Sequence, residues 1–297
     1  MSPLTLQRLP TEGGHVLLAG RACFRLTGAD RVRYLNGQIT NDVRQANEQH
    51  SVYACVTDIK GHVVGDVFVH AADESLWLDA EPGLREVLGP RLERYIIADD
   101  AELTDVTDEW QVWHVFGRAA TVAARGAGRV VRSDRLGVSG VDLWLPVGEP
   151  APVIAGLSIS LEDFETLRVQ CGIPRWPQEL NASTFPPEAG LDARAMSYTK
   201  GCYIGQEILS RIRTTGKMPR SLLLWESDQP VQVGDEVFSE ARVVGEVTSV
   251  TTPPGGAGSC GMAFVKQGCN RPDSILLAGR GAPSIALRVR TPLSIIA

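Results

Sequence analysis

Two kinds of hydrophobic spacing alternate along the first half of the chain. His62 to Ala71 and Ser75 to Ala80 are rich in strand-forming residues on either side of a short polar turn, which predicts a β-hairpin. After Pro82 and Gly83, apolar residues recur at helical spacing, at positions 84, 87, 88, 92 and 95. Glu109 to Phe116 and Val138 to Leu145 again have strand character. We therefore expect an α+β region in which helices cover one face of antiparallel sheet.

After this region, the pattern predicts a further helix and then a change from mixed α and β elements to β-strands alone. Ser160-Leu-Glu-Asp163 has the spacing of a capped helix start, and Gly172 ends the apolar face that follows it. From Ser221 onward, short β-rich runs are separated by Gly, Pro and Asp, which predicts a small β-barrel or sandwich. We place the domain boundary near Lys217, which divides the chain into residues 1–217 and 218–297.

Composition narrows the class of protein. The 297 residues are 43% hydrophobic and 22% charged, as in an ordinary globular protein, and no apolar run approaches the roughly 20 residues of a membrane span. The start of the chain has no signal-peptide pattern, so we expect a cytoplasmic protein without a membrane partner. The six cysteines include no Cys-x-x-Cys pair, and the histidines have no metal-ligand spacing, so we expect no metal site.

Charge is unevenly distributed. The net charge is −6, yet the segment from Arg194 to Arg220 contains six basic residues and one acid, Glu207. Such a segment suits an anionic ligand or forms a solvated basic face. The negative net charge of the whole chain disfavours direct binding of tRNA. Gly256 to Gly261 matches a dinucleotide-binding pattern, but a strand rather than the required helix follows it, which disfavours NAD and FAD.

The segment from Tyr198 to Arg211 carries the most specific chemistry. Gly201 and Gly205 bracket Cys202, and the residues after Gly205 predict a helix. A thiol near a helix N-terminus and beside Lys200 gains thiolate character. The same sequence also fits a tight buried turn, so reactive and structural roles both remain open for Cys202. The side chains of Gln206 and Glu207 could either form hydrogen bonds with the amide edge of a heterocycle or cap the turn.

A second candidate lies in the turn-rich loop from Asn181 to Asp192. Glu188 follows two prolines and stands between apolar neighbours, so its carboxylate is either held in a fixed orientation or exposed to solvent.

Five ordered blocks resemble the YgfZ family of folate-binding proteins, which are related to the T-protein (aminomethyltransferase) of the glycine cleavage system. The signature is Lys200-Gly-Cys-Tyr-Ile-Gly-Gln-Glu207, and the other blocks are Gly28 to Asp42, Asp58 to Asp66, Leu167 to Pro174 and Phe185 to Asp192. The resemblance implies a three-domain ring of the T-protein type, with two intertwined α+β (ferredoxin-like) domains and a C-terminal β-barrel around a tetrahydrofolate channel.

It also implies support of iron-sulfur cluster assembly or repair, including the clusters of enzymes that methylthiolate tRNA. Partners would then be folate and iron-sulfur client or assembly proteins. Cys202 would be the essential thiol with Lys200 beside it, and Glu188 would accept hydrogen bonds from the pterin. The expected folate contacts are Glu188, Phe164, Tyr203, Gln206, Glu207 and Arg211. Arg211 and Arg213 would attract the glutamate tail.

The chain departs from the family in two places. Arg21 stands where a second folate-contacting tryptophan is expected, and Phe164 replaces the first. The T-protein's catalytic aspartate has no match in register in Asp79-Ala-Glu-Pro-Gly-Leu-Arg-Glu86, where Glu86 is displaced. We therefore expect an accessory factor, with a folate-dependent aminomethyltransferase or other one-carbon transfer enzyme as the alternative.

Overall fold

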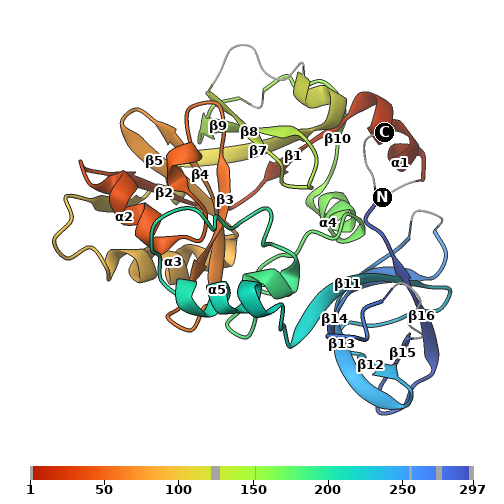
Figure 1. The fold of residues 1–297 in the computed structure, drawn as a ribbon. Helices are drawn as coiled ribbons and strands as arrows, with labels where there is room; N and C mark the ends of the chain where they lie inside the picture. The colour runs from red at the N-terminus through yellow and green to blue at the C-terminus, as the bar shows by residue number, and fades with distance from the viewer. Residues whose placement is uncertain (1–2, 122–127, 151, 254–255, 272–275, 294–297) are drawn as a thin grey trace.

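The computed structural model describes residues 3–121, 128–150, 152–253, 256–271 and 276–293. Two five-stranded sheets, each with its own helices, form the larger part of the molecule, and a closed six-stranded barrel lies beside them (Figure 1). The expected α+β region and C-terminal β-barrel are both present.

The first sheet has the strand order β3-β4-β5-β2-β6, all neighbours antiparallel. The predicted hairpin is its centre, because β4 and β5 join through Asp73 and Glu74, which both adopt positive φ as a tight turn requires. Helices α2 and α3 pack on this sheet, and Leu35 and Leu88 are fully buried there. The bounds are β2 Ala22–Thr27, α2 Arg31–Gln38, β3 Val52–Thr57, β4 Val63–Ala72, β5 Ser75–Ala80, α3 Arg85–Glu93 and β6 Glu102–Asp105.

The second sheet has the order β10-β1-β7-β9-β8. Its helix α4 begins where the sequence predicts, because the Ser160 hydroxyl accepts a hydrogen bond of 3.0 Å from the backbone N–H of Asp163. Leu167 of this helix and Cys171, which follows its last residue, pack into the core of the second sheet. The bounds are α1 Pro3–Glu12, β1 Gly14–Leu18, β7 Trp110–Phe116, β8 Arg129–Ser133, β9 Gly140–Pro146, β10 Leu157–Ser158 and α4 Leu161–Gln170.

The chain interlaces the two sheets. Strand β1 belongs to the second sheet, the chain then completes the first sheet, and β7 to β10 return to the second. Helix α5 (Gln206–Thr215) comes back to the first sheet at Gly205, whose φ is +87°. A Cβ there would lie 2.6 Å from the carbonyl oxygen of Asp58, so only glycine allows this close approach.

The barrel closes in the order β11-β14-β13-β12-β15-β16, with β16 paired to β11. Residues 256–261 run into β14, so the helix that a dinucleotide site requires is replaced by a strand. The sequence pattern did not predict β12 and β15, which have four residues each. The bounds are β11 Arg220–Ser227, β12 Glu236–Ser239, β13 Arg242–Thr251, β14 Ser259–Lys266, β15 Leu276–Gly279 and β16 Ile285–Arg290.

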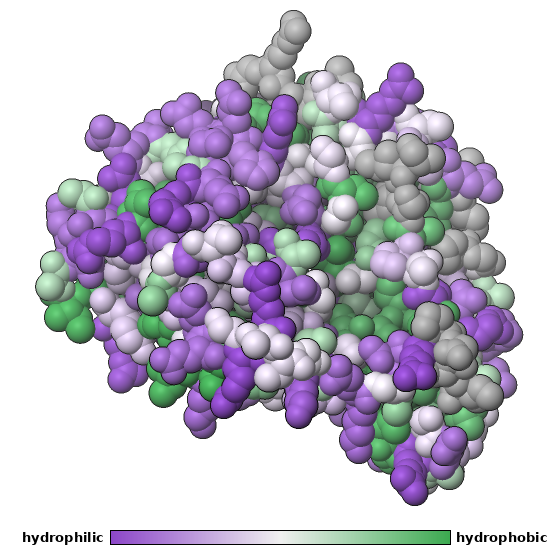
Figure 2. Space-filling view, viewed as in Figure 1, coloured by the Kyte–Doolittle hydropathy of each residue, from purple (hydrophilic) through white to green (hydrophobic). Residues whose placement is uncertain are grey.

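Two buried polar contacts join the barrel to the rest of the molecule. The Ser249 hydroxyl of β13 donates to the carboxylate of Glu179 at 2.6 Å, and Arg168 of α4 donates to the same hydroxyl at 3.1 Å. Apolar surface gathers in the hollow between the barrel and the two-sheet part (Figure 2). Leu222, Leu224 and Met262 of the barrel line a groove there of about 380 Å³.

Candidate functional site

A cavity of about 220 Å³, here called the inner cavity, lies where the two sheets and α4 meet. Its aromatic lining is Tyr53 and Phe68 from the first sheet and Phe164 from α4. Its charged lining includes Arg21, Asp66, Glu81, Arg135 and Arg194. The cavity therefore combines flat apolar faces with several charged groups, as small-molecule sites do.

Asp66 is a carboxylate on this wall with one oxygen that has no hydrogen-bond partner in the described residues. Its side chain is 7% exposed, and Tyr53 donates its phenol O–H to Oδ2 at 3.1 Å. The other oxygen, Oδ1, is buried and has no hydrogen-bond partner within the described part of the chain. Burial raises the pKa of Asp66 to about 6, the charge of Glu81 adds to the rise, and Arg21 opposes it. A ligand N–H group would satisfy this acceptor.

A chain of charged residues starts on the wall of the cavity and continues into the second sheet. Arg21 contacts Glu81 and binds Asp79 at 2.7 Å, and Arg135 binds Asp79 at 2.7 Å and Asp142 at 2.8 Å. The Asp142 carboxylate also contacts His114 at 2.8 Å. Burial raises the pKa of Asp142, but the charges and hydrogen bonds of Arg135 and His114 together outweigh burial and hold that pKa below its usual range. Both oxygens of Asp79 are thus occupied by arginines.

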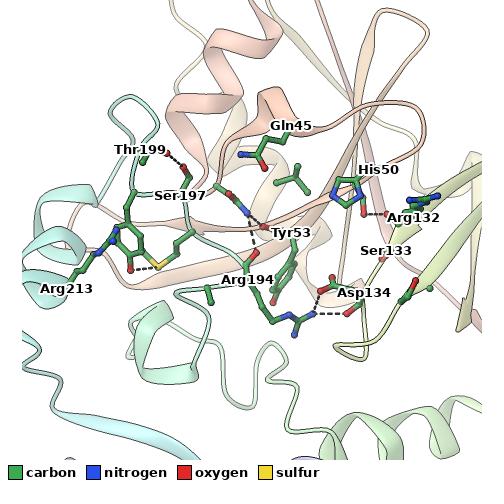
Figure 3. Close-up of a pocket in the computed structure, with 18 residues that line it drawn as sticks. Gln45, His50, Tyr53, Arg132, Ser133, Asp134, Arg194, Ser197, Thr199 and Arg213 are labelled. Carbon is green, nitrogen blue, oxygen red and sulfur yellow. Dashed lines mark hydrogen bonds and ion pairs between the residues drawn. The ribbon is translucent and has the colours of Figure 1, made fainter. Parts of the chain in front are cut away.

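A second and larger depression, here called the outer groove, has a volume of about 630 Å³ (Figure 3). Tyr53 and Arg194 line both the inner cavity and the outer groove. Arg132, Ser133 and Arg213 also line the groove. Because two lining residues are shared, the two spaces adjoin each other.

Of the predicted folate contacts, Phe164 lies on the inner cavity. Glu188 does not line the inner cavity or the outer groove. It is 2% exposed, in a short 3₁₀ helix (Pro186–Ala189), and its carboxylate accepts from the backbone N–H of Phe185 at 3.0 Å and from Arg220 Nε of β11 at 3.3 Å. The alternative of a solvent-exposed acid is wrong. Contact with a pterin stays a prediction for this residue.

Two residues of the signature Lys200 to Glu207 are buried structural groups. Lys200 is 6% exposed, and its ammonium donates to the carbonyl oxygens of Asn36, Ile39 and Asn41 at 2.5, 2.7 and 2.7 Å. Burial lowers its pKa to about 8. Tyr203 is 7% exposed and packs with Leu209, and burial raises its pKa above the usual range. Lys200 therefore holds the chain that leaves α2, and its proposed action on Cys202 is untested.

The remaining signature residues face outward. Cys202 is exposed, whereas the other five cysteines, which all lie in described residues, are buried or partly buried. Gln206 begins α5 and is half-buried, and Glu207 and Arg211 are exposed. The structure brings none of these four to the inner cavity or the outer groove. The basic segment is therefore divided, since Arg194 and Arg213 reach the groove and Arg211 does not.

Sequence reasoning missed Asp66, Tyr53 and Arg135 as cavity residues. One signal was present for Asp66, a carboxylate inside the apolar strand β4. Glu86 is exposed on α3, whereas Glu81 of the same passage lines the cavity. In the described ranges, no three His, Cys, Asp or Glu side chains are grouped to hold a metal ion. No helix there is long and apolar enough to cross a membrane.

Comparison with solved structures decides the fold. The glycine cleavage system aminomethyltransferase T of Bartonella henselae superposes with a TM-score of 0.81 at 16% sequence identity, covering 97% of this chain and 88% of that one. The fold is that of the T-protein. No protein-family model matches the sequence. The interlaced sheets and the barrel are therefore the domains of a T-protein fold, as the sequence resemblance implied.

The sequence relatives of this chain are named either as iron-sulfur cluster assembly factors or as aminomethyltransferases. The mitochondrial iron-sulfur cluster assembly factor IBA57 homologue of Coccidioides immitis is 28% identical over 74% of this chain, and the chain spans 59% of that relative's length. The mouse mitochondrial factor is 26% identical over 81% of the chain and 72% of its own length. An aminomethyltransferase of Rubrobacter xylanophilus is 26% identical over 89% of this chain and 78% of its own length.

Proposed function

We propose that this protein binds tetrahydrofolate and supports the assembly or repair of iron-sulfur clusters, including those of enzymes that methylthiolate tRNA. Relatives named as iron-sulfur cluster assembly factors match most of the chain, and the T-protein fold supports a folate ligand. The cytoplasmic location expected from the sequence and partnership with iron-sulfur assembly or client proteins belong to the same proposal.

The observation that carries the folate part is the unpartnered oxygen of Asp66 in a cavity with aromatic walls. A pterin has an amino group and ring N–H groups on one edge, and a carboxylate accepts from two such donors at once. Phe164 offers a ring face for stacking beside this edge. One oxygen of Asp66 has no partner in the described residues, whereas Glu188 would first have to release Arg220. We therefore assign the pterin to Asp66, Tyr53 and Phe164.

Bound tetrahydrofolate would supply its N5 and N10 nitrogens as carriers of a one-carbon unit. The chain's own residues would orient the pterin and exclude water from it. Cys202, exposed beyond the cavity, would bind a cluster or its precursor only together with thiols from another molecule, because a cluster needs several thiolates.

Aminomethyl transfer is the second candidate, favoured by the relatives named aminomethyltransferases. The buried charge chain argues against it. Asp79 has both oxygens bound by Arg21 and Arg135, and Glu81 contacts Arg21, so neither is available as a free base near a folate nitrogen.

Anaerobic calorimetry with tetrahydrofolate tests the ligand and its place. We expect micromolar binding by the wild type, loss of at least tenfold in Asp66→Asn, and an unchanged affinity in Glu188→Gln. Thermal unfolding checks that each variant is folded. Absence of binding by the folded wild type refutes the folate proposal, and loss confined to Glu188→Gln refutes the assignment to Asp66.

A further inference from the structure

The groove between the barrel and the two-sheet part, here called the barrel groove, has apolar walls on both sides. The barrel contributes Leu222 and Leu224 of β11 and Met262 of β14, and the two-sheet part contributes Ile173 and Leu191. These walls belong to the apolar hollow of the surface between the two parts (Figure 2). The volume of about 380 Å³ is in the range in which proteins bind small molecules.

Strand β11 is apolar on both of its faces, which the wall of a barrel does not by itself require. Leu223 and Trp225 belong to the barrel core. Leu222 and Leu224 alternate with them and therefore lie on the outer face. Leu224 packs with Val169 of α4, whereas Leu222 stays half-buried. The outer face of this strand is thus suited to contact something apolar in the barrel groove.

One cation stands among these apolar side chains without a counter-charge. Arg290 of β16 pairs across the strands with Leu224, so both lie on the same outer face and both line the groove. Its Nη2 donates to the carbonyl oxygen of Gln170 at 3.0 Å, and the guanidinium has no carboxylate partner in the part of the chain that the structure describes. The second cation on the groove, Arg194, binds Asp134 at 3.2 Å.

We propose that the barrel groove binds a small amphiphilic carboxylate, such as a free medium-chain fatty acid, with its chain on Leu222 and Leu224 and its carboxylate on Arg290. Among the described residues that line the groove, none is Asp or Glu, so an anion meets no like charge there. A guanidinium pairs with both oxygens of a carboxylate, and the apolar walls are removed from water by the chain. The inference does not rest on the proposed function.

Calorimetry on the full chain with decanoate, octanoate and 1-decanol, each below its micelle concentration, tests this site. We expect the wild type to bind one decanoate per chain. Octanoate should bind about four- to fifteenfold more weakly, since each methylene group buried in the groove strengthens binding roughly two- to fourfold.

Two variants separate the charge from the apolar walls. Arg290→Gln should weaken decanoate about tenfold and change 1-decanol less than about twofold, because the alcohol has no charge to lose. Leu222→Asn should weaken both ligands at least about fivefold. Thermal unfolding without ligand checks that each variant is folded.

Arg288→Gln is the matched control. Arg288 precedes Arg290 by two residues on the same face of β16, is already paired with Glu226 and Asp228, and does not line the barrel groove. The decanoate affinity of this variant should therefore stay at the wild-type value.

The site is refuted by a folded wild type that shows no saturable decanoate binding. It is equally refuted by equal losses in Arg290→Gln and Arg288→Gln, or by equal losses of decanoate and 1-decanol in Arg290→Gln. Competition between decanoate and tetrahydrofolate would assign the groove to the folate site instead. A dimer that decanoate dissociates, measured by sedimentation velocity, would show that a second copy of the chain covers the groove. Failure of folate binding alone leaves this inference standing.

Discussion

The signature segment and the inner cavity use charged residues in opposite ways. In the segment, the Lys200 ammonium donates hydrogen bonds to three backbone carbonyls, so all of its donors are used within the folded chain. In the cavity, Asp66 is just as buried but keeps one oxygen without a partner in the described structure. A satisfied buried charge stabilises local structure, whereas an unsatisfied one costs stability and is retained where it binds something.

The difference bears on where function is sought. The most recognisable residues of the sequence, Lys200 and Tyr203, stabilise the fold, and the polar wall of the cavity is assembled from positions that are far apart in the chain. Four changes test this contrast, in order of decreasing expected effect.

Replacing Lys200 by methionine should have the largest effect. The change leaves three carbonyl oxygens without their donor, so we expect the free energy of unfolding to fall by about 3 kcal/mol or more. Chemical denaturation measures it. Lys217→Met, at an exposed lysine, is the control and should change stability by less than about 0.5 kcal/mol. A Lys200→Met variant as stable as the wild type would show that the lysine acts in chemistry instead.

Replacing Asp66 by asparagine should stabilise the protein at neutral pH. Its pKa is about 6 in the folded chain against 3.8 as the ordinary value, so the folded state binds more protons between these values and wild-type stability falls as the pH rises through them. Above pH 6 the cost reaches about 3 kcal/mol. Asp66→Asn should remove up to this amount at pH 7.5 and make no difference below pH 3.8.

Denaturation curves across this pH range measure the effect, with the exposed Asp192→Asn as control. Folate affinity of the wild type should fall as the pH drops through about 6, because the acceptor becomes protonated. A variant less stable than the wild type at pH 7.5 would show that the Asp66 carboxylate is well paired after all.

Replacing Arg220 by glutamine should give a smaller loss. Glu188, 2% exposed, would lose its charged partner from the barrel, at a cost of about 1–3 kcal/mol in unfolding free energy, with folate affinity unchanged. Arg288→Gln is the control, because Arg288 pairs with Glu226 and Asp228 on the exposed barrel surface, where water weakens such pairs, and it should scarcely change stability. A large loss of folate affinity in Arg220→Gln would place Glu188 at the ligand.

Replacing Cys202 by serine should scarcely affect stability. The thiol is exposed, so we expect a change below about 0.5 kcal/mol, while the cluster content of a client iron-sulfur enzyme falls to the level found without this protein. Cys269→Ser, at the other partly accessible cysteine, is the control for both measurements. Full client activity with Cys202→Ser would exclude an essential thiol.

Local patterns predicted much of the fold. The hairpin of β4 and β5 and the start of α4 depend on residues within a few positions of one another, such as Ser160 and Asp163. The four-residue strands β12 and β15 are too short for alternation to be recognised, and their pairing is decided by neighbouring strands.

The site was less predictable because its contacts are long-range. The carbonyl partners of Lys200 lie 159 to 164 residues earlier in the chain, so the sequence could suggest Cys202 as a neighbour but not Asn36 or Ile39. Glu188 is covered by Arg220, 32 residues later. The family resemblance, and no local pattern, pointed to the positions of Phe164 and Arg21, which both line the inner cavity.

The interlaced chain order determines which sheet can form first while the chain is being synthesised. Strands β2 to β6, residues 22–105, leave the ribosome before β7, so the first sheet can form while β1 waits for partners at residues 110–116 and 157–158. The inner cavity then requires Phe164 and finally Arg194. A nascent chain therefore completes the inner cavity only after about two thirds of its length has been made, and binding of the proposed ligand would report that both sheets have closed on each other.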